Sequence, residues 1–440
     1  MALEFYRDCS GKARFRFLSL LVLVFVWASA GAAYAAGPPS SPGNIASDSN
    51  SSGPNSSDPN SSGPASSDPA LSDQWEVAIA KDGFHHVYVL YSQKESQCLG
   101  CAALPRLRLA VGSDEGANME GPRQLTPPSF DQVNPAVAVD ANDQRTVYAA
   151  WLERGRKDLL LAKSSDFGHS WSLVVVARAA DAANHPVLFA RGENVAIAFS
   201  RDHQMWTASS HDGGITFDIV GVSALAPVRD VLAGGATIDA NGNEYIAWDG
   251  YGSQVSPEIN LYISKSGDQG KNWTTTLMDR SRGAANCKGP QCEWGYLSAQ
   301  IAIASDSAGT IYSLWNSNHP GRQDAERIYF SSSTTAGETW SPKTEVSSAP
   351  AGTRHVLPAI VAGTTGEVRI AWMDSRNSPR WSAYSRSSTN GGATWSPEEL
   401  VSMYVPNSGY IPGQDSAPPF MSWPEDARAY SDSLSSPGGF

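Results

Sequence analysis

An octapeptide of the form Ser-x-Asp-x-Gly-x-x-Trp recurs along the chain, and it constrains the fold more than any other feature. Some copies carry Phe for Trp, or Asn or Thr for Asp, and the first is only a fragment. The copies begin at Ser113, Ser164, Ser210, Ser266, Ser333 and Ser388. Because one repeat cannot bury its own apolar face, this array predicts stacked or radially arranged units.

A hairpin pattern precedes each octapeptide. Alternating apolar residues flank an Asx or Gly turn, as in 137–151, and this pattern predicts two antiparallel strands. The second strand of each hairpin ends in an aromatic residue: Tyr91, Trp151, Phe199, Trp248, Trp315 and Trp372. A charged content of 17% with 39 Gly and 14 Trp also favours an all-β protein with many tight turns.

The acidic residues of the octapeptides are expected to be structural. An Asp or Asn side chain accepts hydrogen bonds from the backbone amides that follow it, and Gly supplies a position with positive φ. The Trp then buries a large ring against the neighbouring sheet. We therefore assign as turn residues Asp114, Asp166, Asp212, Asp268 and Asn390.

These octapeptides resemble the Asp-box (BNR) repeats of the sialidase-like β-propellers. The resemblance covers residues 73–404. It implies an all-β fold, a six-bladed β-propeller whose blades each contain four antiparallel strands. Asp-boxes also occur in sortilin-type receptors and photosystem assembly factors, so the resemblance indicates the fold more than the activity.

Three segments flank the predicted propeller. Residues 1–36 carry a cationic start, an apolar centre and Ala-x-Ala sites, which predicts a secretory signal peptide; an uncleaved membrane anchor is the alternative. Residues 37–72 repeat Asn/Ala-Ser-Ser-Gly/Asp-Pro and are expected to be a disordered linker. Residues 405–440 are a closing strand, a tail or the start of a truncated element.

Cysteine usage agrees with export. Cys98, Cys101, Cys287 and Cys292 form two closely spaced pairs, which favours disulfides in an oxidising compartment. Pairing within or across the pairs, and a four-thiolate zinc site, remain alternatives. We expect no metal and no cofactor. The adjacent His85 and His86 are expected on a strand with side chains on opposite faces, so they would not chelate together.

Charge limits the possible partners. A net charge of −12 disfavours nucleic acid, because phosphate binding needs clustered cations. We expect a glycan or glycoprotein ligand, an exported monomer in the secreted, cell-surface or periplasmic space, and membrane association only if the N-terminal segment is uncleaved.

Loop length indicates which face of the propeller binds a ligand. With strands a to d in each blade, the a–b turns and the octapeptides share one face, since antiparallel strands alternate in direction. The opposite face carries the longer loops, and function usually lies on loops of a rigid scaffold. Candidate ligand-binding residues on that face are Asp249, Arg280, Arg282, Trp294 and Arg376.

The resemblance implies a divergent glycoside hydrolase of the exo-α-sialidase type. That chemistry uses three arginines on the substrate carboxylate, a Tyr nucleophile activated by a Glu, and an Asp acid/base. Candidate catalytic residues are Glu293, Arg354, Asp374 and Tyr410. The F/Y-R-I-P motif with the first arginine is absent from the opening strand, 75–80. The alternative is a non-catalytic propeller that binds glycan or protein.

Overall fold

The computed structural model describes thirteen stretches of the chain, numbered 4–7, 13–16, 72–95, 105–126, 131–153, 155–178, 184–222, 228, 230–251, 258–282, 299–318, 325–377 and 380–403. Most of the predicted signal peptide and linker, and all of 405–440, lie outside these residues. Near the N-terminus, β1 (Glu4–Arg7) pairs antiparallel with β2 (Ala13–Arg16). A search of the described stretches found no helix long and apolar enough to cross a membrane.

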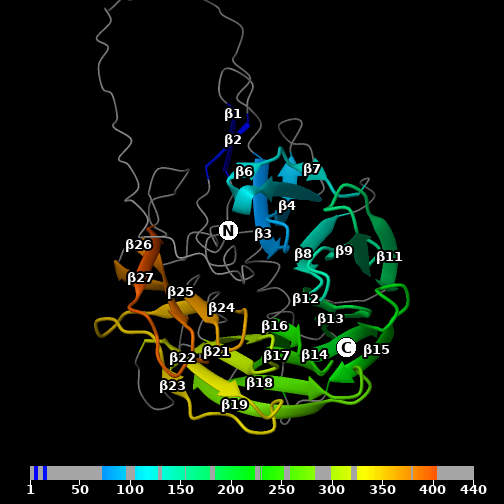
Figure 1. Cartoon of the computed structure of the whole chain (residues 1–440). Helices are drawn as coiled ribbons and strands as arrows, with labels where there is room; N and C mark the ends of the chain where they lie inside the picture. Colours follow the sequence, from blue (N-terminus) through cyan, green and yellow to red (C-terminus); the bar gives the residue numbers. More distant parts are fainter. Residues whose placement is uncertain are drawn as a thin grey trace, which may run out of the picture.

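Six antiparallel sheets follow one another around a central axis, in chain order from blue to orange (Figure 1). Blade 1 consists of β3 (Ser72–Lys81), β4 (Val87–Glu95), β5 (Arg106–Ser113) and an outer strand divided into β6 (Asn118–Met119) and β7 (Arg123–Gln124). A 3-10 turn, η1 (Asp114–Gly116), follows β5. Blade 2 consists of β8 (Gln132–Val139), β9 (Val147–Glu153), β10 (Asp158–Ser164) and β11 (Ser172–Ala177). Blade 3 consists of β12 (Asn184–Arg191), β13 (Asn194–Arg201), β14 (Gln204–Ser210) and β15 (Asp218–Val222).

The second half repeats this order. Blade 4 consists of β16 (Asp230–Ile238), β17 (Glu244–Tyr251), β18 (Glu258–Ser266) and β19 (Thr274–Arg282). Blade 5 consists of β20 (Gln300–Ser305), β21 (Ile311–Ser317), β22 (Arg327–Ser333) and β23 (Thr344–Glu345). Blade 6 consists of β24 (His355–Ala362), β25 (Val368–Asn377), β26 (Arg380–Ser388) and β27 (Glu399–Met403). The predicted six-bladed β-propeller is therefore confirmed, and every blade is built from consecutive strands.

The hydrophobic core lies between the blades. All seven residues of β9 are buried, as expected for a strand covered on both faces. The aromatic residue near the end of each second strand is almost fully buried: Tyr91, Trp151, Phe199, Trp248, Trp315 and Trp372. Five clusters join successive blades from 1 to 6, and the octapeptide aromatic of the later blade packs in each. This packing explains why the octapeptide ends in a large ring.

The innermost strands are bent by β-bulges. The register of the innermost pair shifts in blades 1, 2, 3, 4 and 6. Three of these shifts contain a proline: Pro135, Pro186 and Pro358. Proline lacks an amide N–H, so it fits a position where the hydrogen-bond ladder is interrupted. Bulges of this kind redirect side chains at the end of a strand.

Each octapeptide forms the turn between the third and fourth strands. In blade 2, Ser164 Oγ donates to Asp166 Oδ1 (2.8 Å) and accepts from the Gly168 amide (2.8 Å), while Asp166 accepts from the Ser170 amide and hydroxyl. Three of these bonds recur around Asp212, Asp268 and Asn390: from Ser Oγ to the Asx side chain, from the Gly amide to Ser Oγ, and from the amide four residues later to the Asx side chain. In blade 5, Thr335 Oγ1 replaces the acid by accepting from the Thr339 amide (2.9 Å).

Hydrogen bonds from hydroxyl and amide groups hold the octapeptide aspartates ionised. They lower the pKa of Asp166 and Asp212 well below the usual value, and that of Asp268 to about 2. The fragmentary copy differs, since Asp114 lies in η1 and accepts from Asn118 Nδ2 (2.6 Å). These contacts are local, so the octapeptide carboxylates act within their own turns.

A second set of aspartates, not assigned from the sequence, organises the a–b turns. Asp82, Asp239 and Asp306 are buried, and each accepts from turn amides and from a tyrosine hydroxyl six residues later. Blades 3 and 6 have no such aspartate in their a–b turns. There, the Gly192 and Gly366 amides donate to the aspartate of the preceding blade, Asp140 or Asp306 (both 2.9 Å).

One sequence expectation on this face is wrong. His85 and His86 lie in the turn between β3 and β4 rather than on a strand, and His85 adopts a φ of 71°. The reason is Asp82, whose carboxylate accepts from the His86 amide and contacts His86 Nδ1 (2.7 Å), so that the chain turns there. The alternation of apolar residues that suggested a strand begins only at Val87.

Candidate functional site

The face opposite the octapeptides carries a ring of paired polar residues. Here each innermost strand begins and each second strand ends, and at least one antiparallel pair of residues in every blade is polar. The six pairs, which we call the polar rungs, are Gln74–Gln93, Gln132–Glu153, Asn184–Ser200, Asp230–Tyr251, Gln300–Asn316 and His355–Asp374. The sequence signal was a polar residue one to three positions after each second-strand aromatic.

Several rung residues also connect neighbouring blades. Gln132 is fully buried, and its Oε1 accepts from the Leu107 amide of blade 1 (3.1 Å). Gln300 Oε1 accepts from the Leu357 amide of blade 6 (3.2 Å). Buried amide side chains that are hydrogen-bonded in this way hold a fixed orientation. Gln132 and Gln300 therefore hold the rungs of blades 2 and 5 in fixed positions against the neighbouring blades.

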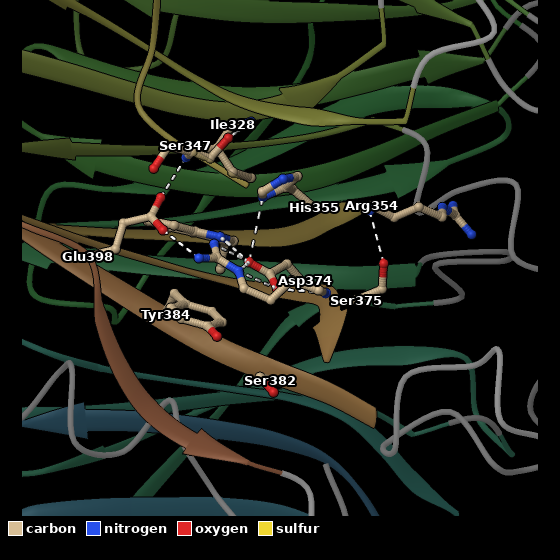
Figure 2. Close-up of polar contacts among 12 residues, drawn as sticks. Ile328, Ser347, Arg354, His355, Asp374, Ser375, Ser382, Tyr384 and Glu398 are labelled. Atoms are coloured by element: carbon tan, nitrogen blue, oxygen red, sulfur yellow. Dashed lines mark hydrogen bonds and ion pairs between the residues drawn. The ribbon is translucent and has the colours of Figure 1, made fainter. Parts of the chain in front are cut away.

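The densest charged group lies in blade 6 and includes two residues assigned from the sequence, Asp374 and Arg376 (Figure 2). Asp374 is fully buried and accepts from Arg376 Nε (2.8 Å) and Nη2 (2.6 Å). Arg376 Nη1 also donates to Glu398 (2.7 Å), and its guanidinium lies 3.6 Å from the centre of the Tyr384 ring. These partners raise the pKa of Arg376 further, so it remains a cation that is fully engaged within the chain.

His355 completes this group. Figure 2 places it facing Asp374, and its Nδ1 lies 3.8 Å from Asp374 Oδ2. Its Nε2 lies 3.3 Å from Arg327 Nη1. Burial, together with the positive charges of Arg327 and Arg376, lowers the pKa of His355 to about 3. The ring is therefore neutral at physiological pH, and Nε2 accepts the hydrogen bond from Arg327.

Arg354, assigned as a catalytic arginine, is paired with a carboxylate from the neighbouring blade. Its Nε and Nη2 donate to the two oxygens of Glu326 (2.9 and 3.1 Å), which is a bidentate pair. The Arg354 amide donates to Ser375 Oγ (3.0 Å), which fixes its backbone to blade 6. Figure 2 shows the Arg354 side chain extending away from Asp374 and His355.

Asp249, assigned as a ligand-binding residue, is buried near the end of β17. Tyr251 Oη donates to its Oδ2 (3.2 Å), and its Oδ1 has no hydrogen-bond partner among the residues that the structure describes. Burial raises the pKa of Asp249 to about 8. The carboxyl group therefore keeps its proton at neutral pH, as acids in dry environments do.

Arg280 and Arg282 lie on the outer strand of blade 4, in another blade than Arg354 and Arg376. Both are exposed on β19, the outermost strand of blade 4, whereas Arg354 precedes the innermost strand of blade 6. The sequence placed them in a link that opens on the ligand face, but β19 continues to Arg282 and holds them at the rim. They do not converge with Arg354 and Arg376.

The neighbouring Asp279 is a residue that sequence reasoning missed. It joins blades 4 and 5 by accepting from Trp315 Nε1 (2.8 Å), Ser317 Oγ (2.8 Å) and Lys343 Nζ (2.6 Å). The only signal in the sequence was an acidic residue directly after Leu277 and Met278, which did not identify its partners.

We expect Asp279→Ala to destabilise the propeller by about 1 to 3 kcal/mol, because the indole and the hydroxyl lose their acceptor. Thermal denaturation checks this result. Asp218→Ala, on the exposed outer strand of blade 3, is the matched control. Equal melting temperatures for the two variants would contradict the inter-blade role of Asp279.

The other assigned residues cannot be placed. Glu293, Trp294 and Tyr410 lie outside the described residues, as do the four cysteines of the predicted disulfides: Cys98, Cys101, Cys287 and Cys292. Most of the longer loops of this face belong to the same undescribed segments. Within the described stretches, no group of three or more His, Cys, Asp or Glu is arranged to hold a metal ion.

The solved structures that are similar to this chain share little sequence with it. No family model matches the chain, and the curated proteins contain no match. Similar solved structures include a polysaccharide lyase, PL25 ulvan lyase (10% identity, 75% of this chain, 86% of that chain, TM-score 0.48), and the NanB sialidase from Streptococcus pneumoniae (8%, 69%, 65%, 0.46). Another is YCF48 bound to D1 peptide (15%, 75%, 84%, 0.40).

Proposed function

We propose that this chain is an exported carbohydrate-binding propeller that takes its ligand on the face of the polar rungs. The ring of polar rungs is the observation that carries the proposal. Elsewhere the two inner strands present apolar residues to the core, yet at this end every blade places a polar pair. A polyhydroxylated ligand requires many fixed donors and acceptors at one concave end of a scaffold.

Hydrolysis of sialosides is the second candidate. The Asp249–Tyr251 pair favours it, because a carboxyl group with a pKa of about 8 is still protonated at neutral pH and can serve as a proton donor. Two observations weigh against it. The innermost strand of blade 1 carries no arginine between residues 75 and 80, and Arg354 and Arg376 are held by carboxylates of the chain itself.

A glycan array probed with the purified full chain tests the binding proposal, and a panel of fluorogenic glycosides tests hydrolysis. We expect binding without turnover. Asp374→Asn should weaken binding at least about tenfold, because it disrupts the charge pair that orients Arg376 and His355. The matched control is Asp268→Asn, whose side chain lies in a turn on the opposite face.

Thermal denaturation establishes that both variants remain folded. If the chain neither binds nor hydrolyses any glycan, the proposal is overturned. Turnover of a sialoside that is abolished by Asp249→Asn would replace it with the second candidate.

A further inference from the structure

Two arginines beside the blade 6 rung, Arg354 and Arg376, are already occupied by carboxylates of the same chain. A ligand carboxylate needs a cation with free N–H donors, most effectively a bidentate arginine fork. Arg354 is the most accessible of these arginines, with a side chain that is 38% exposed. Its fork is nevertheless filled by Glu326, a carboxylate that is only 7% exposed.

Arg376 is even less available. Its guanidinium is bound by Asp374 on one side and by Glu398 on the other, and the Tyr384 ring covers one of its faces. Asp374 is fully buried, so drawing Arg376 toward a ligand would leave an uncompensated charge. The Glu398 carboxylate is fixed as well, because it accepts from the Ser348 amide (2.6 Å).

Arg354 and Arg376 differ in the number of carboxylates that hold them. Glu326 is the only carboxylate that holds the Arg354 side chain among the contacts found in the described residues, whereas Arg376 has two. Removing the charge of Glu326 would therefore release a half-exposed arginine fork. Removing the charge of Glu398 would leave Arg376 paired with Asp374.

We propose that the sugar bound at the polar rungs is uncharged, and that Glu326 determines this preference by filling the fork of Arg354. The proposal rests on the carbohydrate-binding function and adds the class of ligand. A carboxylated sugar would have to displace Glu326 from Arg354. The Glu326 carboxylate would then be buried without a partner. A neutral sugar has no carboxylate that competes for Arg354, so it leaves the Arg354–Glu326 pair intact.

An array of oligosaccharide pairs that differ only in a terminal carboxylate, a neutral glycan beside its sialylated or uronylated form, tests this preference. The natural chain is expected to bind the neutral member at least about tenfold more tightly. Glu326→Gln should reduce that ratio by about tenfold, because Arg354 becomes available to the acidic member. Glu398→Gln is the matched control and should leave the ratio in place.

A double variant shows whether Arg354 is responsible for the stronger binding of the acidic glycan by Glu326→Gln. Glu326→Gln combined with Arg354→Gln should return the ratio to its natural value, and this variant also tests the idea if the single change alters stability. A natural preference for acidic glycans, or an unchanged ratio in Glu326→Gln, would overturn this inference while leaving carbohydrate binding intact. Absence of binding to every member would instead overturn the proposed function, and this inference with it.

Discussion

Asp249→Asn is expected to raise the free energy of unfolding at pH 8 by roughly 2 to 5 kcal/mol. The native protein holds the Asp249 proton up to a pKa of about 8, whereas the unfolded chain releases it near 3.8. Between these values the native state binds more protons at Asp249, so this residue alone makes the natural chain progressively less stable as the pH rises from about 4 to about 8. Asparagine carries no ionisable proton and removes this loss.

Thermal or urea denaturation from pH 4 to pH 9 measures the difference. The variant and the natural chain should converge near pH 4 and separate progressively above it. Glu244→Gln should behave in the same direction with a smaller effect, because burial raises the pKa of Glu244 from 4.5 to about 7. The lowered pKa of His355 makes the protein more stable as the pH rises, but only below 6.5, the pKa of this residue in the unfolded chain. A comparison at pH 8 therefore reports on Asp249 and Glu244 alone.

Asp218→Asn is the matched control, because this aspartate is exposed on the outer strand β15. Its denaturation profile should follow that of the natural chain throughout. A lower midpoint for Asp249→Asn at pH 8 would contradict a buried, protonated carboxyl group at this position.

Asp306→Ala is expected to destabilise the propeller by about 3 to 5 kcal/mol. The carboxylate is 1% exposed and accepts four hydrogen bonds, from the amides of Ala308 (3.0 Å) and Thr310 (2.9 Å), from Tyr312 Oη (2.7 Å) and from the Gly366 amide (2.9 Å). Alanine leaves these donors buried without a partner. Because Gly366 belongs to blade 6, the substitution weakens two blades together.

Hydrogen exchange and thermal denaturation report the two effects separately. The Gly366 amide should lose protection along with the amides of blade 5. Asp268→Ala is the matched control, since it removes a turn aspartate whose contacts are solvent-exposed and confined to one turn. A loss of stability equal to that of the control would contradict the bridging role of Asp306.

The architecture could be predicted because it depends on local chemistry repeated many times. The Ser, Asp and Gly of the octapeptides in blades 2, 3 and 4 bond to one another within five residues, and this pattern is visible in the sequence. The aspartates of the a–b turns are equally visible in the sequence, but their structural role was missed. That role depends on hydrogen bonds from a tyrosine six residues away and from an amide in another blade.

The candidate site was less predictable. Asp374 and Arg376 were both assigned from the sequence, but their pairing with each other and with Glu398 was not. Arg280 and Arg282 were assigned to the same face as Arg354, although β19 extends far enough to hold them at the outer edge. The carboxylate that fills the fork of Arg354 lies 28 residues earlier in the chain, beyond the reach of any local pattern.

The sequence by itself determined the number of blades, the position of their strands and the face on which the octapeptides lie, because turns and strand alternation depend on interactions between near neighbours. Only the tertiary structure decided which charged groups are available to a ligand. Ion pairing and burial depend on what the adjacent blade brings within a few ångströms. For Arg354, Arg376 and Asp249, those neighbours decide the charge and accessibility that function requires.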